Sequence, residues 1–218
     1  MKLTIFDLDN TLLAGDSDYT WGNFLVAKGV VNADQYQLEN ERFYLEYQRK
    51  TLDIFAYQRF VLAPLMVIGV TEREALHAEF MQHYIAPLRQ VKADALIAKH
   101  KAQADTLLVI TATNRFIAEP IVSMLNIDHL LATDPEIIND QFTGNIVGTP
   151  CFQEGKIERL KQWMDSNSEK YSEITFYSDS INDAPLLEFV DHAIAVDPDD
   201  DLHALALEKG WAIISLRD

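Results

Sequence analysis

KLTIFDLDNTLL, residues 2–13, decides the fold, because an apolar run ends there on two closely spaced aspartates. The run is short and rich in β-branched and aromatic side chains, so we predict a buried strand over 2–7. Alternate side chains of an extended chain point to the same side, which would direct Asp7 and Asp9 at one point. A cap or a turn accounts for one such carboxylate but not for both. The pair therefore indicates a site that needs a cation.

The composition is that of a globular chain with an excess of acid. Of the 218 residues, 48% are hydrophobic and 24% are charged, and the formal net charge is −16. This charge disfavours nucleic acid and anionic membranes as partners, because both bind basic surfaces. Any phosphate site must therefore be local, built from a few cations, backbone N–H groups or a metal ion.

The sequence offers little to indicate disulfide bonds, a membrane span or a secretory signal. Cys151 is the only cysteine, which excludes an intrachain disulfide and a thiolate metal cluster. The apolar run at 61–70 contains Pro64 and falls short of the roughly 18 residues of a membrane span. No secretory signal precedes the first aspartates. We expect a cytoplasmic protein that is a monomer or a homodimer.

The chain divides into a helical part and a part in which strands alternate with helices. Helical signals fill residues 17–86, beginning at Ser17 as a predicted cap. Further strands are predicted over 106–111, 129–133, 173–178, 192–196 and 211–215, with an antiparallel addition over 142–147. This alternation predicts an α/β fold with a Rossmann-like, mostly parallel sheet covered on both faces. The expected domains are a core of residues 1–16 and 87–218 and a helical insert of residues 17–86.

Polar residues follow three of the predicted strands, in FDLDNT, ITATN and YSDSIND. Ligands of such sheets bind at the carboxyl ends of the strands. Taken singly, Asp183 is explained as a helix-end acid and Thr111 as a strand-end hydroxyl. Together with the first pair, Asp179 and Asp183 could bring four carboxylates into one crevice, where mutual repulsion would be destabilising. Mg²⁺ resolves this repulsion, since it takes carboxylates together with water and substrate phosphate.

These segments resemble the four motifs of the haloacid dehalogenase (HAD) superfamily of phosphohydrolases. FDLDNTLL resembles the DxDxT motif, ITAT the second motif, and YSDSINDAPLL the DxxxD motif. Lys156, in CFQEGKIERL, stands where the family has its third-motif lysine, although alone it would pass for an exposed helix lysine. The order and spacing agree over essentially the whole chain. The resemblance implies an Mg²⁺-dependent phosphomonoester hydrolase acting on a small phosphorylated metabolite.

The resemblance also implies catalytic roles. Asp7 is similar to the nucleophile that forms an aspartyl-phosphate, and Asp9 to the general acid and base. Thr111 and the backbone N–H of Ala112 would donate hydrogen bonds to the phosphoryl group. Lys156 would neutralise charge on Asp7 and on the transferred group.

The same resemblance implies the metal ligands. Mg²⁺ would be held by Asp7, the backbone carbonyl of Asp9 and Asp179. Asp183 would be a further ligand or would support the ligands. Asn182 would orient Asp179 or a group on the phosphate side.

Residues 17–86 stand where the family places a C1-type helical cap, and the cap most resembles that of the phosphoserine phosphatase-like branch. In that branch an acidic residue binds the substrate ammonium, and Asp16 occupies its position, with Asp18 close by. A cap arginine binds the substrate carboxylate, and Arg59 is the candidate here. Arg59 lies about two residues from the expected site, a rotation of roughly 200° on a helix. Arg42 and Arg49 are the other candidates.

The displacement of Arg59 from the expected carboxylate-binding position affects which substrate the sequence predicts. An ammonium site without a carboxylate clamp suits a phosphorylated amino alcohol such as histidinol phosphate at least as well as phosphoserine. An aromatic wall for an imidazole or a cation could be formed by Trp21, Phe24, Phe43 and Tyr44. Aromatic residues at helical spacing more often belong to the core, so both explanations stay open.

Two alternatives share the aspartyl-phosphate chemistry. A phosphotransferase or phosphomutase would deliver the phosphoryl group to an acceptor other than water. A receiver-like signalling module would use a phosphorylated aspartate as a switch without turnover. Such modules are usually shorter and lack about 70 residues of helical insert after the first strand. Asp9, which can activate water, favours hydrolysis.

Overall fold

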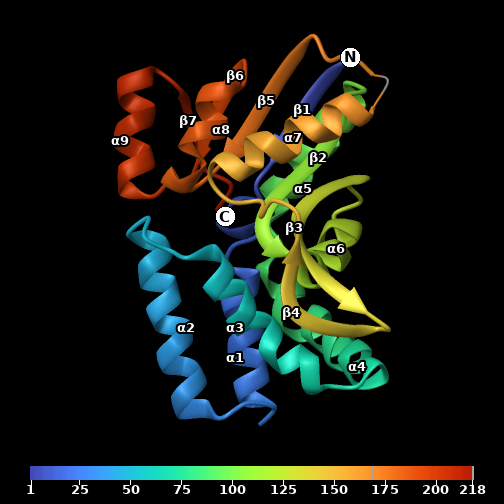
Figure 1. Ribbon diagram of the computed structural model, residues 1–218. Coiled ribbons are helices and arrows are strands. Elements are labelled where there is room, and N and C mark those ends of the chain that lie inside the picture. The colour runs from blue at the N-terminus through green and yellow to red at the C-terminus, as the bar shows by residue number, and fades with distance from the viewer. Residues whose placement is uncertain (168, 218) are drawn as a thin grey trace.

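The sheet has seven strands in the order β4-β3-β2-β1-β5-β6-β7 (Figure 1). The computed structural model describes residues 1–167 and 169–217. The strands are β1 Lys2–Phe6, β2 Thr106–Asn114, β3 His129–Ile138, β4 Gln141–Val147, β5 Glu173–Ser178, β6 His192–Val196 and β7 Ala212–Ile214. All pairs are parallel except β3–β4, which is antiparallel. The predicted α/β class and the antiparallel addition are confirmed.

Both faces of the sheet are apolar, as the central strands require. On β2, Leu107 and Val109 belong to one buried cluster, whereas Leu108 and Ile110 belong to the other. The first cluster is covered by α5 (Val91–Ala102) and α6 (Arg115–Met124), and the second by α7 (Glu154–Ser166), α8 (Ala184–Phe189) and α9 (Asp200–Lys209). Each fully buried aliphatic side chain contributes about 1.5–3 kcal/mol. Because both faces of the sheet are buried, the strands are held in place, and so are the loops at their carboxyl ends.

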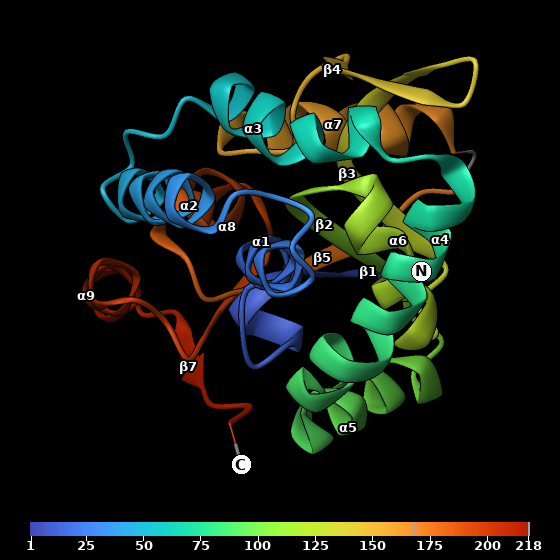
Figure 2. The ribbon, with the colours of Figure 1, turned by 90° about the horizontal axis from the view of Figure 1, so that it is seen from below.

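The remaining helices gather beyond the carboxyl end of β1 (Figures 1 and 2). They are α1 Ser17–Ala27, α2 Ala33–Gln48, α3 Ile54–Val67 and α4 Val70–Phe80, followed by helical turns over Met81–Ile85 and Ala86–Leu88. The helical prediction for residues 17–86 is therefore confirmed. The N-cap residue predicted for α1, Ser17, is wrong by one position. The Asp16 carboxylate is the N-cap and accepts a hydrogen bond from the Tyr19 backbone N–H at 2.8 Å, and Ser17 is the first helical residue.

No single helix among residues 1–167 and 169–217 is long and apolar enough to cross a membrane. By length and composition alone, Ile54–Val67 and Val70–Leu88 pass that test together, as a pair bent by 119°.

A wide turn follows β1 and leads the chain toward α1. The strand stops at Phe6, and the Asp7 backbone N–H donates to the carbonyl of Tyr177 on β5 at 2.9 Å. The turn spans Leu8–Leu12, and its Asn10 has a left-handed backbone with φ of 56°. Asp9 therefore lies in a turn and not on the strand. The alternation of side chains along a strand, which predicted that Asp7 and Asp9 point the same way, therefore does not apply to Asp9. Both carboxylates nevertheless line the same cavity.

Candidate active site

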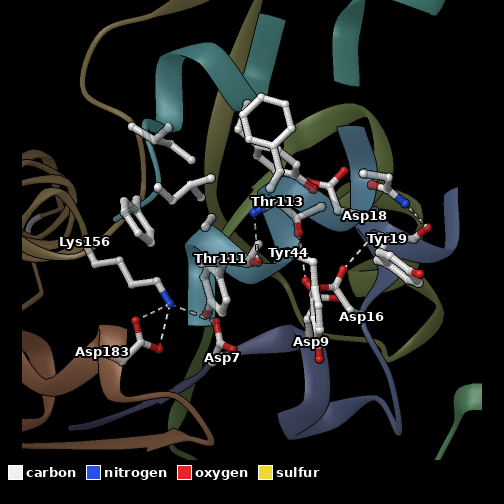
Figure 3. Close-up of a pocket in the computed structure, with 18 residues that line it drawn as sticks. Asp7, Asp9, Asp16, Asp18, Tyr19, Tyr44, Thr111, Thr113, Lys156 and Asp183 are labelled. Carbon is white, nitrogen blue, oxygen red and sulfur yellow. Dashed lines mark hydrogen bonds and ion pairs between the residues drawn. The ribbon is translucent and has the colours of Figure 1, made fainter. Parts of the chain in front are cut away.

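A cavity lies between the carboxyl ends of the strands and helices α1–α3 (Figure 3). Its lining is acidic and aromatic. The acidic lining residues are Asp7, Asp9, Asp16, Asp18 and Asp183, and the aromatic ones are Tyr19, Phe43, Tyr44, Tyr47, Tyr57 and Phe152. Lys156 is the one Lys or Arg among the described lining residues, and Thr111, Ala112 and Thr113 complete the polar side. The structure thus brings most of the predicted site residues together.

Lys156 joins two of the aspartates. Its ammonium donates to Asp7 Oδ1 and to Asp183 Oδ2, both at 2.8 Å, and the Ser178 hydroxyl also donates to Asp183 Oδ2 at 2.7 Å. Burial would lower the pKa of Lys156, but the carboxylates of Asp183 and Asp7 outweigh it and raise the pKa. Lys156 is only 3% exposed, so it is not a solvated helix lysine.

The helix that carries Lys156 starts against a tight loop. A Cβ atom on Gly155 would lie 2.2 Å from the Pro150 carbonyl oxygen, a contact that the backbone must move to relieve. We expect Gly155→Ala to lower the free energy of unfolding by about 1–3 kcal/mol and to lower activity by displacing Lys156. Urea unfolding and steady-state kinetics measure both effects. Gly69→Ala, where nothing lies within 4 Å of the added Cβ, is the control. Equal stability of the two variants would contradict this account.

Asp9 is held by a backbone donor and a hydroxyl. Its Oδ1 accepts from the Ser17 backbone N–H at 2.6 Å, and its Oδ2 accepts from the Thr113 hydroxyl at 2.8 Å. Burial raises the pKa of Asp9 to about 6, the charge of Asp16 adds to the increase, and these hydrogen bonds oppose it. A carboxyl group with this pKa can exchange a proton near neutral pH. Thr113 was not singled out in the sequence.

Asp7 is the more strongly perturbed of the pair. Burial raises its pKa to about 7, the charge of Lys156 opposes the increase, and the charge of Asp183 adds to it. Thr111 lies beside it on the cavity wall, and the Thr111 hydroxyl accepts from the Thr113 backbone N–H at 3.2 Å. Ala112 also lines the cavity, while its carbonyl accepts from the Thr133 hydroxyl at 2.8 Å.

Asp179 lies at the edge of the cluster, facing a neighbouring depression that Asp16 also lines. Its Oδ1 accepts from the Thr11 hydroxyl at 3.1 Å. Burial raises the pKa of Asp179 well above its usual value, and the charges of Asp7 and Asp183 raise it further. Among the described residues, no three His, Cys, Asp or Glu side chains form a ready metal cage.

Among the described residues, Asn182 contacts the end of α2 and the loop before α7, and not Asp179. Its side-chain N–H donates to the Tyr47 carbonyl at 3.1 Å, and its Oδ1 accepts from Gln153 at 3.1 Å. The Tyr47 hydroxyl in turn donates to the Ser180 hydroxyl at 3.1 Å. Asn182 thus ties the end of α2 to the loop after β5. These contacts differ from the predicted one to Asp179, and the alternative contact with a group on the phosphate side stays a prediction.

The predicted arginine clamp is absent from the described lining of the cavity. Arg59 is exposed and lines a separate surface hollow with Glu136 and Asn145. The physical reason is helical rotation: Tyr57 faces the cavity, and a residue two positions later points roughly 200° away. Arg42 is also exposed and pairs with Glu39 and Glu46 on its own helix. Arg49 is exposed at the end of α2.

The predicted aromatic wall is half right. Phe43 and Tyr44 line the cavity, but Trp21 and Phe24 are fully buried in the core. Four further aromatic lining residues were missed: Tyr19, Tyr47, Tyr57 and Phe152. Tyr44 and Tyr47 lie three residues apart on α2, the helical spacing that could have indicated a shared face.

Comparison with known proteins identifies the family. The profile of haloacid dehalogenase-like hydrolases matches residues 4–188. The chain belongs to this family. It is 42% identical to the histidinol-phosphatase of Neisseria meningitidis serogroup C (strain 8013), with 99% of each chain covered. This family membership and the phosphatase class expected from the motifs are confirmed.

Two more relatives extend the comparison. The phosphoserine phosphatase SerB1 of Mycobacterium tuberculosis (strain ATCC 25618 / H37Rv) is 31% identical, over 97% of this chain and 70% of that protein. A crystal structure of a protein of unknown function from Bordetella pertussis Tohama I is 39% identical and superimposes with a TM-score of 0.93, covering 99% and 98% of the two chains. The histidinol-phosphatase and the phosphoserine phosphatase are named for different substrates, so family membership does not define the substrate of this chain.

Proposed function

We propose that this phosphatase hydrolyses the phosphate ester of a small amino alcohol, with histidinol phosphate as the first candidate, through an aspartyl-phosphate on Asp7. The observation that carries the substrate class is the charge distribution of the cavity. Lys156 lies at one side with Asp7, whereas Asp16 and Asp18 lie at the other (Figure 3). No arginine is among the described lining residues to bind a substrate carboxylate. A phosphate at one end and a cationic amine at the other match this arrangement, and phosphoserine matches it less well.

In the first step, a carboxylate oxygen of Asp7 attacks phosphorus. The P–O bond to Asp7 forms while the ester P–O bond breaks, and the leaving alkoxide takes a proton from the Asp9 carboxyl group. The Thr111 hydroxyl and the Ala112 backbone N–H bind the phosphoryl oxygens, because both residues lie on the cavity wall. Lys156 keeps its 2.8 Å contact with Asp7 Oδ1 and offsets the charge that gathers there.

In the second step, Asp9 acts in the opposite direction. Its carboxylate takes a proton from a water molecule as the water oxygen attacks phosphorus. The P–O bond to Asp7 then breaks, which releases inorganic phosphate and restores both aspartates. The Ser17 and Thr113 hydrogen bonds orient the Asp9 carboxylate throughout, at 2.6 and 2.8 Å.

The donor set fits a magnesium ion. Three carboxylates, of Asp7, Asp179 and Asp183, act on one another electrostatically, and the one ammonium that contacts them, of Lys156, bonds Asp7 and Asp183. Asp7, Asp179 and the backbone carbonyl of Asp9 would hold the ion, which when bound shields the carboxylates from the phosphate dianion. Asp183 would support these ligands, because both of its oxygens already contact Lys156 at 2.7–2.8 Å.

The test is a panel of phosphate esters assayed for phosphate release with Mg²⁺ and after dialysis against a chelator. We expect kcat/KM for histidinol phosphate to exceed that for phosphoserine by at least about tenfold, and chelation to abolish turnover of both. A preference for phosphoserine or for sugar phosphates would overturn the substrate proposal, and full activity without a divalent ion would overturn the magnesium proposal.

The same panel separates the alternatives. Stoichiometric release of inorganic phosphate over many turnovers excludes a non-turnover switch, whereas transfer to an added alcohol would reveal a phosphotransferase. We propose that residues 17–86, which contain helices α1–α4, act as the cap over this site, since α1, α2 and α3 supply most of its aromatic lining. The cytoplasmic location and the monomeric or homodimeric state stay predictions.

A further inference from the structure

Asp18 differs from the other acidic residues of the cavity in its partners. Asp7 and Asp183 contact Lys156, Asp9 accepts from Ser17 and Thr113, and Asp16 caps α1. The Asp18 carboxylate, in contrast, has one long direct hydrogen bond among the described residues, 3.4 Å from the Asn114 side chain. Asp18 is nevertheless only 4% exposed.

A buried carboxylate with so little compensation is costly to the free protein. Burial raises the pKa of Asp18 well above its usual value, and the charges of Asp16 and Asp9 raise it further. The Tyr57 hydroxyl is near enough to lower the pKa again, but it is a neutral donor. Strongly perturbed buried acids of this kind cluster at functional sites, where a ligand can supply a further donor. An N–H group of a ligand would be such a donor.

The location of Asp18 says which part of a ligand would reach it. Lys156 and Asp18 lie on opposite sides of the cavity (Figure 3). Asp16 directly precedes Ser17, whose backbone N–H donates to the Asp9 carboxylate, whereas the Asp18 carboxylate accepts from Asn114. Asp16 is thus nearer to the catalytic aspartates, and Asp18 lies further from them (Figure 3).

The walls around Asp18 favour a flat ring. The Tyr57 hydroxyl is beside Asp18, and Phe43 and Tyr57 meet edge to face with ring centres 5.4 Å apart. Both rings line the cavity. In histidinol phosphate the amine is on the carbon next to the ester methylene, and the imidazole is one methylene further away. The amine therefore falls near Asp16 and the ring falls near Asp18.

We propose that Asp18, assisted by Tyr57, determines substrate specificity by accepting a hydrogen bond from a ring N–H of the substrate's imidazole. This inference rests on the proposed function, because it assigns the distal part of the same substrate. It gives different roles to two acidic residues that are two positions apart. Asp16 binds the substrate amine, and Asp18 binds the substrate ring.

The test compares two substrates that differ only in the ring, histidinol phosphate and the phosphate ester of 2-aminopropan-1-ol. We expect Asp18→Asn to lower the ratio of their kcat/KM values by about 10- to 100-fold, as the loss of a charge-assisted hydrogen bond does. Tyr57→Phe should lower the ratio less. Asp34→Asn, an exposed change of the same charge on α2, should leave the ratio unchanged. An equal loss on both substrates, or no loss, would refute the role of Asp18.

A second readout does not depend on turnover. By calorimetry, histidinol should bind Asp18→Asn at least about tenfold more weakly than the wild type. Without ligand, the variant should be no less thermostable than the wild type, because an under-compensated buried acid has been removed. If the wild type binds histidinol through Asp18 but does not hydrolyse its phosphate ester, the proposed function fails and this inference stands. If the wild type does not bind histidinol, or the variant binds it equally well, this inference fails.

Discussion

Asp7→Asn is expected to lower kcat for phosphate release by roughly 10⁴- to 10⁶-fold, the range seen when a nucleophile is removed. The amide keeps an oxygen that accepts the hydrogen bond from Lys156, so the geometry of the site is preserved while the attacking carboxylate is lost. The measurement is phosphate release at pH 8 with Mg²⁺. Asp7→Ala, which has no amide for water to hydrolyse back to an acid, checks for reversion.

The fold of this variant can be tested independently. Asp7→Asn should unfold cooperatively and near the wild-type temperature, since the burial that raises the pKa of Asp7 to about 7 no longer acts on a charge. Asp34→Asn serves as the control for a change of one exposed charge. Wild-type turnover in Asp7→Asn, after reversion is excluded, would end the assignment of Asp7 as nucleophile.

The sequence predicts the chemistry of the site better than its geometry. Asp7, Thr111 and the loop after β5 could be placed together because they lie near the carboxyl ends of neighbouring parallel strands, which meet at one edge. The sequence also predicts that Asp9 shares the site of Asp7, but it does so from strand alternation. In the structure the strand ends at Phe6, and a turn presents the Asp9 carboxylate. Local pattern gives the positions of the strands and their burial, but it does not give the path of a turn.

The positions of side chains on helices α1–α3 are less predictable from the sequence. Whether an aromatic residue faces the core or the cavity depends on which helix packs against it, and this explains why Trp21 is buried while Tyr57 lines the site. Thr113 contacts Asp9 across 104 residues of sequence, and Thr11 contacts Asp179 across 168. The hydrophobic periodicity of a sequence carries no information about contacts between residues so far apart in the chain. Arg59 shows the same limit, because a rotation of two residues on a helix moves a side chain from one surface to another.

Lys156→Met is expected to lower both activity and stability, because it leaves Asp7 and Asp183 buried without their cation. Removing one partner of a buried ion pair costs about 3–5 kcal/mol of unfolding free energy. Turnover should fall by at least about 10³-fold, since the charge that offsets the transferred phosphoryl group is lost. Urea unfolding at pH 8 measures the first effect. Lys161→Met, on the exposed side of the same helix, loses only an exposed contact over the Phe189 ring and should change stability by less than about 1 kcal/mol.

The pH dependence of this loss gives the sharper test. The folded pKa of Asp7, about 7, lies above its usual 3.8, so the folded state favours the protonated acid and loses stability as pH rises between these values. Without Lys156 the folded pKa rises further, while the ammonium of the wild type stays charged throughout this range because its own pKa is raised. The stability difference between wild type and Lys156→Met should therefore be smaller near pH 5 than at pH 8. A difference that is constant from pH 5 to 8 would mean that Lys156 stabilises the fold by packing and not by its charge.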